Sequence, residues 1–511
     1  MSTLSAQRSA VLRQSVLWGV VPALLLLLSV STGCISTGTN PVSGNTRAYG
    51  YTWQEEVKLG AKADEQIQNQ YGVYDDKQLQ QYVDEVAQEV LAESHLRRSD
   101  TEEQFRETEF HFRVLDSPTV NAFALPGGYV YLTRGLLAHL NNEAQMAVVL
   151  GHEIAHVAAR HASQQAARQQ LTKGLLLGGA IAGQVAFGGN VGENVLGIGG
   201  TAAQLLSLSY SRDNERESDR LGVQYAVRAG YDAAEGANFF ETLERMQEQS
   251  EQSIPTWQST HPDPGAREQN IPQIAQKWKK KIEGTQSMVD QEDYYNGLAN
   301  IILGNNPRQG FAEGGVFYHP ELAFRFSIPS EWTVQNQPRQ VAIIHPDQEA
   351  YMVFGFAEGD TPEAAARKFA GQEGLSVLER QSTAVNGYDA RRVLAEGKTQ
   401  KGQVVRLLVY FIAYDGNVYQ FQGATSAEQY STYRGTFRQS IESFNRLTDS
   451  QILNVEPTRL AIRSAGQRAA FRAFVNEGDL PEGMTNTDLA ILNQLTLSET
   501  VAEDRPLKLP D

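Results

Sequence analysis

Residues 141–170 read NNEAQMAVVLGHEIAHVAARHASQQAARQQ, and this stretch decides how the chain folds around its candidate site. Alanine, valine, leucine and glutamine dominate it, with no proline and a single glycine. Such a composition favours a helix, here one that runs to about Gln170. Asn142 is placed to cap its start, with Gln145 three residues later as in a capping box.

The middle of this helix carries the pentapeptide H-E-x-x-H, from His152 to His156. Two histidines four positions apart project from one helix face, so both can reach one zinc ion. Glu153 lies about 100° around the helix, close enough to act as general base on a zinc-bound water. The alternative is a buried helix with incidental histidines.

A catalytic zinc ion needs a third protein ligand and an open fourth position. The candidate third ligand is Glu215, with Glu217 as second choice. Asp219 lies four residues after Glu215, so a helix would place both on one side. Asp219 can then accept a hydrogen bond from the far nitrogen of a liganding histidine and fix its tautomer. The alternative for this charged run is a solvated helix face.

Counting positions excludes the metzincin class of zinc peptidase. That class needs a glycine three residues and a histidine six residues after the second histidine of the motif. Here those positions hold Ala159 and Ala162. His161 comes one residue too early, and a continuous helix would turn it away from the ligand pair. We therefore expect His161 to be a structural residue or a partner of a ligand.

Three further segments carry a family resemblance that covers about Tyr49 to Arg267. They are N-E-R-E-S-D at 214–219, N-A-F-A-L-P-G-G at 121–128, and T-H-P at 260–262 with an arginine at 267. Together with the zinc motif they resemble gluzincin metalloproteases of the HtpX/CAAX-protease type, in the soluble periplasmic branch. Ser218 stands where that family more often has alanine, another small residue.

The resemblance implies a zinc endopeptidase with one Zn²⁺ per chain. It implies His152, His156 and Glu215 as ligands. It implies that Glu153 is the general base and that Asp219 supports the ligands. By the same resemblance, His261 and Arg267 would line the site near the scissile carbonyl. His261 can stabilise the oxyanion there, or close the fourth zinc position and hold the enzyme off.

Substrate binding is predicted at a strand beside the active helix. Tyr129 to Thr133 follow a Gly-Gly turn and have strong strand character. The preceding segment, with Asn121, Ala122 and Phe123, would then be an edge strand. An extended substrate peptide can pair with such an edge. The alternative is an ordinary hairpin.

The N-terminus predicts a secreted lipoprotein. Residues 1–33 carry two arginines, no acidic residue and an apolar run from Val16 to Val30, followed by Ser-Thr-Gly and Cys34. Cys34 is the only cysteine, which fits lipidation of the first mature residue and allows no disulfide. By resemblance to Gram-negative lipoproteins, we expect an outer-membrane anchor with the body in the periplasm. An uncleaved N-terminal anchor is the alternative.

The charge balance narrows the class of partner. The chain has 44 basic and 60 acidic residues, a formal net charge of −16. This balance argues against nucleic-acid binding and against electrostatic attachment to anionic lipid.

We predict an α+β protein made of several parts. A mainly helical zincin-type metalloprotease core with a small sheet precedes an α+β module resembling the PsbP fold and a small C-terminal module resembling a degenerate LysM unit. The predicted boundaries are a signal peptide at 1–33, a tether at 34–50, the protease domain at 51–285, a linker at 286–310, the α+β module at 311–447 and the C-terminal module at 450–511.

Several elements are expected within these parts. Strands are expected at 104–115, 323–329, 341–344, 351–356, 404–414 and 418–423, and helices at 362–371, 427–444 and near 467–476. The apolar, glycine-rich stretch at 171–210 is expected to pack as buried helices, or alternatively to meet membrane or apolar substrate.

Two functions are consistent with these features. The first is a zinc endopeptidase that degrades misfolded or misassembled envelope proteins, with outer-membrane assembly machinery as a further partner. The second is a non-proteolytic periplasmic chaperone or assembly factor that uses the same cleft. The intact Glu153 favours the first.

Overall fold

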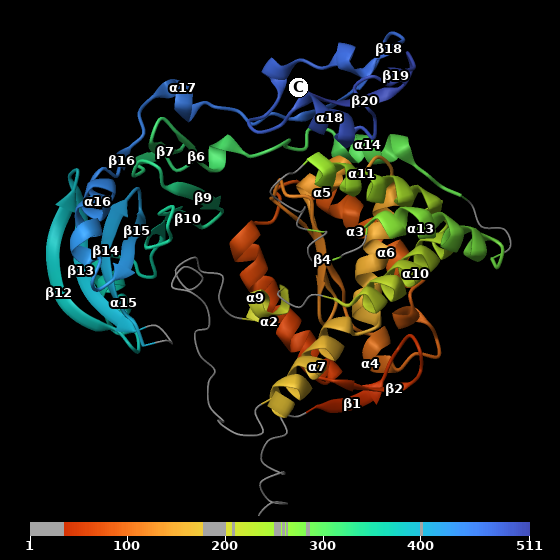
Figure 1. The fold of residues 1–511 in the computed structure, drawn as a ribbon, viewed down its shortest axis with the longest axis horizontal. Helices are drawn as coiled ribbons and strands as arrows, with labels where there is room; N and C mark the ends of the chain where they lie inside the picture. The colour runs from red at the N-terminus through yellow and green to blue at the C-terminus, as the bar shows by residue number, and fades with distance from the viewer. Residues whose placement is uncertain are drawn as a thin grey trace, which may run out of the picture.

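The fold is mixed α+β, with a helical N-terminal region that carries the site and a β-rich region after it (Figure 1). This agrees with the expected fold class at that level. The computed structural model describes residues 35–176, 201–206, 210–249, 257, 261, 264–282, 287–398 and 402–511. The predicted signal peptide, Cys34 and most of 171–210 lie outside the described residues. In the described part, no helix is long and apolar enough to cross a membrane.

A three-stranded sheet and a set of helices form the N-terminal region. The sheet has the order β3-β5-β4, with β3 parallel and β4 antiparallel to β5. Its strands are β3 (His111–Leu115), β5 (Tyr129–Thr133) and β4 (Ala122–Leu125). The helices before the active helix are α2 (Trp53–Tyr71), α3 (Lys77–Ala92), α4 (Glu103–Arg106) and α5 (Arg134–His139). The strand expected at 104–115 is therefore wrong in its first half. A helical turn there brings Phe105 edge-on against Trp53, with ring centroids 4.8 Å apart.

The active helix α6 (Glu143–Ala158) is buried along its whole length. It crosses α10 (Arg212–Arg228) so closely that a Cβ on Gly222 would lie 2.6 Å from the backbone nitrogen of His152. Glycine at this crossing lets the two backbones meet, which brings the acidic start of α10 against the histidines of α6. The remaining helices of this region are α7 (His161–Leu176), α9 (Thr201–Leu206), α11 (Gly236–Gln249), α13 (Pro264–Lys279) and α14 (Gln291–Leu298).

The expectation of one continuous helix to Gln170 is wrong. Asn142 caps the start as expected, but α6 ends at Ala158 and Arg160 takes a positive φ of 59° before α7 begins. The side chain of Arg160 explains this break. Its guanidinium lies 3.6 Å from the centre of the Tyr49 ring, pairs with Glu56, and donates to the carbonyl of Tyr51 at 2.9 Å. These contacts compensate a backbone conformation that non-glycine residues rarely adopt.

The segment expected to be a tether is folded in the structure. β1 (Ser36–Thr39) and β2 (Thr46–Tyr49) form an antiparallel hairpin. Tyr49 is fully buried, and the side-chain amide of Asn40 donates to the carbonyl of Ala159 at 2.9 Å. The hairpin therefore packs on the end of the active helix, which its polar composition did not indicate.

The β-rich region contains a seven-stranded antiparallel sheet with two helices. Its order is β12-β13-β14-β15-β11-β10-β9. The strands are β9 (Thr333–Gln337), β10 (Gln340–Ile344), β11 (Ala350–Phe356), β12 (Ser376–Val385), β13 (Tyr388–Lys398), β14 (Val404–Tyr414) and β15 (Asn417–Ser426). The helices are α15 (Pro362–Ala370) and α16 (Tyr430–Glu442), at positions close to those expected.

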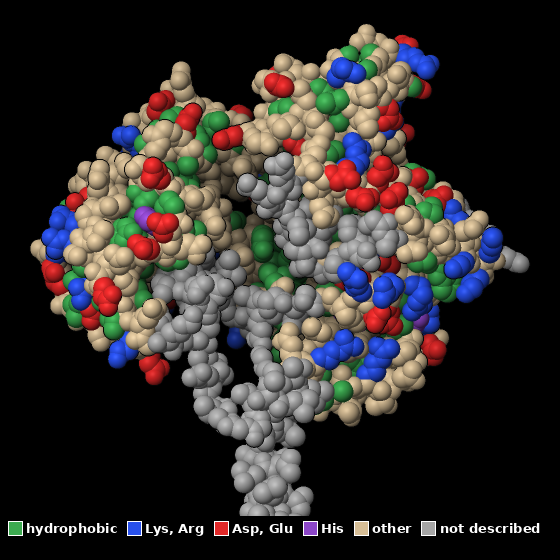
Figure 2. All heavy atoms as spheres, viewed as in Figure 1, with side chains coloured by type: hydrophobic (Ala, Val, Ile, Leu, Met, Phe, Trp, Pro, Cys, Tyr) green, Lys and Arg blue, Asp and Glu red, His purple; other side chains and the backbone are tan. Residues whose placement is uncertain are grey.

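A second, four-stranded sheet stands beside it, with the order β16-β8-β7-β6. Its strands are β6 (Phe311–Glu313), β7 (Val316–His319), β8 (Phe324–Ser327) and β16 (Asn445–Arg446). On the face drawn in Figure 2, acidic and basic side chains are intermixed on the left of the molecule, whereas on the right basic side chains gather below a group of acidic ones.

The C-terminal segment packs on the helical region. It comprises α17 (Ser450–Leu453), β17 (Leu460–Ser464), β18 (Ala469–Ala470), α18 (Asn486–Leu492), β19 (Thr500–Val501) and β20 (Pro506–Pro510). The helix expected near 467–476 is wrong, because a short 3₁₀ turn at Phe471–Phe474 stands there. Buried residues of this segment, among them Leu489 and Leu507, belong to the same hydrophobic cluster as the active helix.

Candidate metal centre

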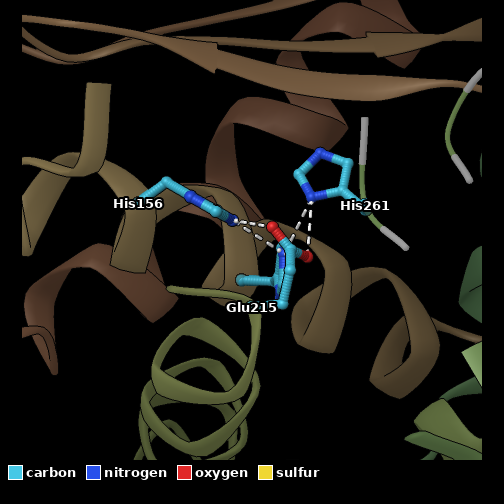
Figure 3. A group of neighbouring side chains, drawn as sticks. His156, Glu215 and His261 are labelled. Atoms are coloured by element: carbon cyan, nitrogen blue, oxygen red, sulfur yellow. Dashed lines mark hydrogen bonds and ion pairs between the residues drawn. The ribbon is translucent and has the colours of Figure 1, made fainter. Parts of the chain in front are cut away.

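Four buried side chains converge between α6, α10 and the segment before α13. They are His152 and His156 from α6, Glu215 from the first turn of α10, and His261. One ligand atom from each lies within 4.8 Å of the others, which is the spacing that a single metal ion needs. Figure 3 shows His156, Glu215 and His261 pointing toward one another from different parts of the chain.

The distances define which atoms face the centre. The Nε2 atoms of His152 and His156 lie 3.0 Å apart. Each lies 3.5 Å from an oxygen of Glu215. His261 Nδ1 lies 3.0 Å from Glu215 and 3.3 Å from His152 Nε2. Histidine nitrogens with one carboxylate form a donor set that zinc prefers.

Two carboxylates lie near the ligands in different roles. Asp219 Oδ1 lies 2.9 Å from Nδ1 of His152, the nitrogen that faces away from the centre. A carboxylate at this distance can accept the N–H of a liganding histidine and so fix its tautomer. Glu217, the second-choice ligand, faces away from the centre and lies 3.2 Å from His161 instead.

Arg267 lies beside the carboxylates. Its Nε donates to Asp219 at 2.9 Å, and its Nη2 pairs with Glu215. Its side chain is 3% exposed, so this guanidinium balances two buried negative charges. A direct role of Arg267 at the scissile carbonyl stays a prediction.

Glu153 fits a general base beside a metal. Its side chain is fully buried, and neither carboxylate oxygen has a hydrogen-bond partner among the described residues. His261 Nε2 approaches it at 3.7 Å. A buried carboxylate without partners is costly unless a bound group completes it. The unpaired oxygens of Glu153 and the four potential ligands beside it therefore fit a bound zinc ion.

Burial and charge set the protonation of the ligands. Burial holds the pKa of His156 well below its ordinary value, so its ring is neutral and able to bind metal. Burial acts to raise the pKa of Glu215, but the charge of His261 and a hydrogen bond from His152 hold it well below its usual range. Burial also acts to lower the pKa of His152, but Asp219 and Glu215 outweigh it and raise that pKa to about 9. Metal binding would therefore release a proton from His152.

Sequence reasoning missed two aromatic residues around the centre. The Tyr210 ring lies 4.0 Å from the His156 ring, and Trp257 stacks on His261 with ring centroids 4.8 Å apart. Trp257 stands four residues before His261, whose backbone N–H donates to the carbonyl of Trp257 at 2.8 Å, so this helical spacing could have indicated it. Tyr210 has no such spacing relation to the motifs, and only the fold brings it to the site.

The predicted substrate strand lies at the edge of its sheet. β4 pairs with β5 on one side only, and its neighbour along the chain, Asn121, accepts a hydrogen bond from Thr133 at 3.0 Å. The side chain of Phe123 is buried and stacks on Tyr131, whereas Ala122 is fully buried. Only the backbone of this strand is therefore suited to receive a peptide.

Comparison with known proteins shows which proteins this region is similar to. Residues 76–275 match the model of Peptidase family M48. The chain is 28% identical over 258 residues to the β-barrel assembly-enhancing protease of Yersinia pestis, a match that covers 48% of this chain and 51% of that protein. A putative β-barrel assembly-enhancing protease of Vibrio cholerae is 30% identical over 228 residues, 43% of this chain and 45% of that protein. The chain thus spans about half the length of these relatives.

A mitochondrial relative carries the same region. The metalloendopeptidase OMA1 of Bos taurus is 31% identical over 168 residues, 32% of this chain and 31% of that protein.

Among solved structures, cyanobacterial PsbP from Synechocystis matches 27% of this chain and 98% of its own at 12% identity, with a TM-score of 0.22. That likeness is too slight to support the predicted PsbP-like fold. Residues 76–275 are therefore similar to peptidases of family M48, and they contain the buried cluster of His152, His156 and Glu215.

Proposed function

We propose that this chain is a zinc-dependent endopeptidase that hydrolyses peptide bonds of misfolded or misassembled envelope proteins. One observation carries the enzymatic part. Glu153 is fully buried beside the four residues that could hold a metal ion, and in the described part of the chain neither of its carboxylate oxygens has a hydrogen-bond partner. A catalytically inactive protein that acted only as a chaperone would not need an ionisable side chain beside the metal site.

The residues divide the work of the reaction. His152, His156 and Glu215 would hold the ion, which supplies polarisation of the scissile carbonyl and of the attacking water. Glu153 takes the proton from that water. Asp219 keeps His152 in the tautomer that presents Nε2 to the centre.

His261 acts as a restraint on this site rather than as an oxyanion donor. Its Nδ1 lies within 3.3 Å of both Glu215 and His152, inside the ligand set. A catalytic zinc keeps its fourth position open, and a fourth protein ligand closes it. We expect His261→Ala to increase hydrolysis and His261→Ala with Glu153→Gln to abolish it. A loss of hydrolysis in His261→Ala with metal still bound would favour the oxyanion role.

The substrate would bind as an extended peptide along β4, whose outer edge is unpaired among the described residues. The name of the bacterial relatives, β-barrel assembly-enhancing protease, supports envelope proteins as substrates and outer-membrane assembly machinery as a partner. We also propose a periplasmic location with a lipid anchor on Cys34, supported by the pattern of the first 34 residues. Cys34→Ala should then move the protein from the membrane fraction to the soluble fraction.

The enzymatic proposal is tested with unfolded casein as substrate. We expect cleavage by the wild type, none by Glu153→Gln, and none after treatment with EDTA until zinc is restored. Glu153→Gln should still bind one zinc ion, because Glu153 is not a ligand. Equal cleavage by all three samples would contradict the proposal, and binding of casein without cleavage by the wild type would favour the chaperone function.

A further inference from the structure

The break between α6 and α7 brings His161 back to the metal centre. With a positive φ at Arg160, the chain turns and places His161 Nδ1 3.1 Å from Nδ1 of His156. His161 is fully buried. The contact joins the outward-facing nitrogen of a metal ligand to a histidine that a continuous helix would have turned away.

The direction of this hydrogen bond follows from the site. His156 faces the centre with Nε2, so a neutral, metal-binding ring carries its proton on Nδ1. That proton can only be donated to an unprotonated Nδ1 on His161. His161 must then carry its own proton on Nε2.

An acceptor for that second proton is present. Glu217 Oε2 lies 3.2 Å from His161 Nε2, within hydrogen-bonding distance. Arg47 of the N-terminal hairpin approaches the same carboxylate oxygen at 3.9 Å. Ser218 Oγ also lies near His161 Nδ1, at the longer distance of 3.3 Å.

We propose that His161 and Glu217 form a positioning pair for His156, a chain of two hydrogen bonds that fixes the tautomer and orientation of this ligand. The inference rests on the proposed function, since it assumes that the centre binds metal. In this arrangement each histidine ligand has its own supporting contact. Asp219 supports His152, and the His161–Glu217 pair supports His156. The carboxylates of both supports, Glu217 and Asp219, come from α10 and follow Glu215 by two and four residues.

The test measures zinc affinity of the full chain by competition with a chromophoric chelator. Loss of a support behind a histidine ligand typically costs about 10- to 100-fold in metal affinity. We expect that loss in Glu217→Ala, and a loss of no more than about threefold in Glu217→Gln, whose amide oxygen still accepts the N–H. Asp213→Ala is the matched control, because it removes the same charge from an exposed position on the same helix.

A double variant separates positioning from a general effect of charge or stability. If Glu217 acts through His161, then Glu217→Ala should cost little further affinity in a His161→Ala background. Cobalt-substituted protein should show an altered absorption spectrum in Glu217→Ala and an unaltered one in Asp213→Ala. If His161→Ala does not fold, the comparison of Glu217→Ala with Glu217→Gln still decides.

The outcomes distinguish this inference from the proposed function. A wild type that binds no zinc would overturn both. A wild type that binds zinc and cleaves casein, with Glu217→Ala at wild-type affinity, would overturn only the positioning pair. Equal losses in Glu217→Ala and Glu217→Gln would also overturn it, because charge alone would then explain the effect.

Discussion

At the scale of single residues, Arg267 balances the charge of the centre. Its guanidinium bridges Glu215 and Asp219 within a buried environment. Removing one partner of a buried ion pair leaves uncompensated charge and typically costs about 3–5 kcal/mol. A bound zinc ion supplies positive charge at the same place, so it should take over part of this balance.

We therefore expect Arg267→Met to lower the free energy of unfolding by about 3–5 kcal/mol in the metal-free protein. The loss should be clearly smaller with saturating zinc. Denaturant unfolding with chelator and with zinc measures both values. Arg216→Met is the control, since Arg216 lies exposed on α10, the helix that carries Glu215 and Asp219, and its loss should change stability by no more than about 0.5 kcal/mol. Equal losses with and without zinc would contradict the charge-balancing role.

Spacing made the main site residues predictable. His152 and His156 follow the four-residue repeat of a helix, and so do Glu215 and Asp219, so their faces could be assigned from the sequence. The position of His161 could not. It depends on the positive φ of Arg160, which is held by contacts with Tyr49, Tyr51 and Glu56 from a distant segment.

At the scale of elements, the pairing of β4 with β5 determines which backbone groups face the open edge. Thr133 donates to the carbonyl of Asn121, so this pair is hydrogen-bonded. Hydrogen-bonded and non-hydrogen-bonded residue pairs alternate along an antiparallel ladder. The backbone N–H and C=O groups of Phe123 and Leu125 therefore point toward β5, and the backbone N–H of Ala124 points outward. A proline at position 124 would remove one outward donor without breaking the ladder.

We expect Ala124→Pro to reduce kcat/KM for peptide hydrolysis by about 2- to 10-fold, the value of one lost backbone hydrogen bond. Zinc affinity should not change, because no ligand moves. Ala124→Ser keeps the N–H and serves as control. Wild-type kcat/KM in Ala124→Pro would show that substrate does not pair with this edge.

Buried histidines at element ends make stability depend on pH. Burial lowers the pKa of His95 and that of His139 from 6.5 to about 4. Between these values the unfolded chain binds more protons than the native state, so stability is full above pH 6.5 and is lost as the pH falls toward 4. Each residue contributes a slope of up to about 1.4 kcal/mol per pH unit in this window.

The prediction concerns the difference between variants, since carboxylates add their own pH dependence. Between pH 4.5 and 6, His139→Asn should reduce the slope of the unfolding free energy against pH by up to about 1.4 kcal/mol per pH unit, the contribution of one histidine. Its amide can still donate to the carbonyl of Gly135, the acceptor of His139 Nδ1 at 2.7 Å. His111→Asn, at a partly exposed position of β3, is the control. An unchanged slope in His139→Asn would contradict the assignment.

Elements with alternating apolar residues were predicted well, and those with charged alternation were not. β8, β10, β11, β14 and β15 match expected strands, whereas β12 and β13 were missed. Their pairing uses charged residues such as Arg392 and Glu379, which contact across the two strands. A strand held by such pairs gives no period-two apolar signal.

At the scale of the whole molecule, the chain leaves the helical region and returns to the same place. Leu303 donates to the carbonyl of Thr458 at 2.9 Å, and Leu460 donates to that of Ile301 at 2.9 Å. Residues 311–447 build their own hydrophobic clusters between these points. Residues after 457 instead share the cluster of the active helix, and the buried Lys508 donates to the carbonyls of Ala138 and Leu140.

This arrangement predicts opposite results for two deletions of the chain. Replacing 311–447 by a short Gly/Ser linker should preserve the zinc affinity, because Arg308 already lies 3.4 Å from the carbonyls of Leu453 and Val455 on the returning segment. Removing 448–511 should destabilise the remaining protein by several kcal/mol, because each large apolar side chain that loses its cover costs about 1.5–3 kcal/mol. Calorimetry and zinc titration of both variants measure the difference. The opposite result would be loss of zinc binding in the variant without 311–447, with zinc binding and stability kept in the variant without 448–511. The β-rich region rather than the C-terminal segment would then complete the hydrophobic core around the active helix.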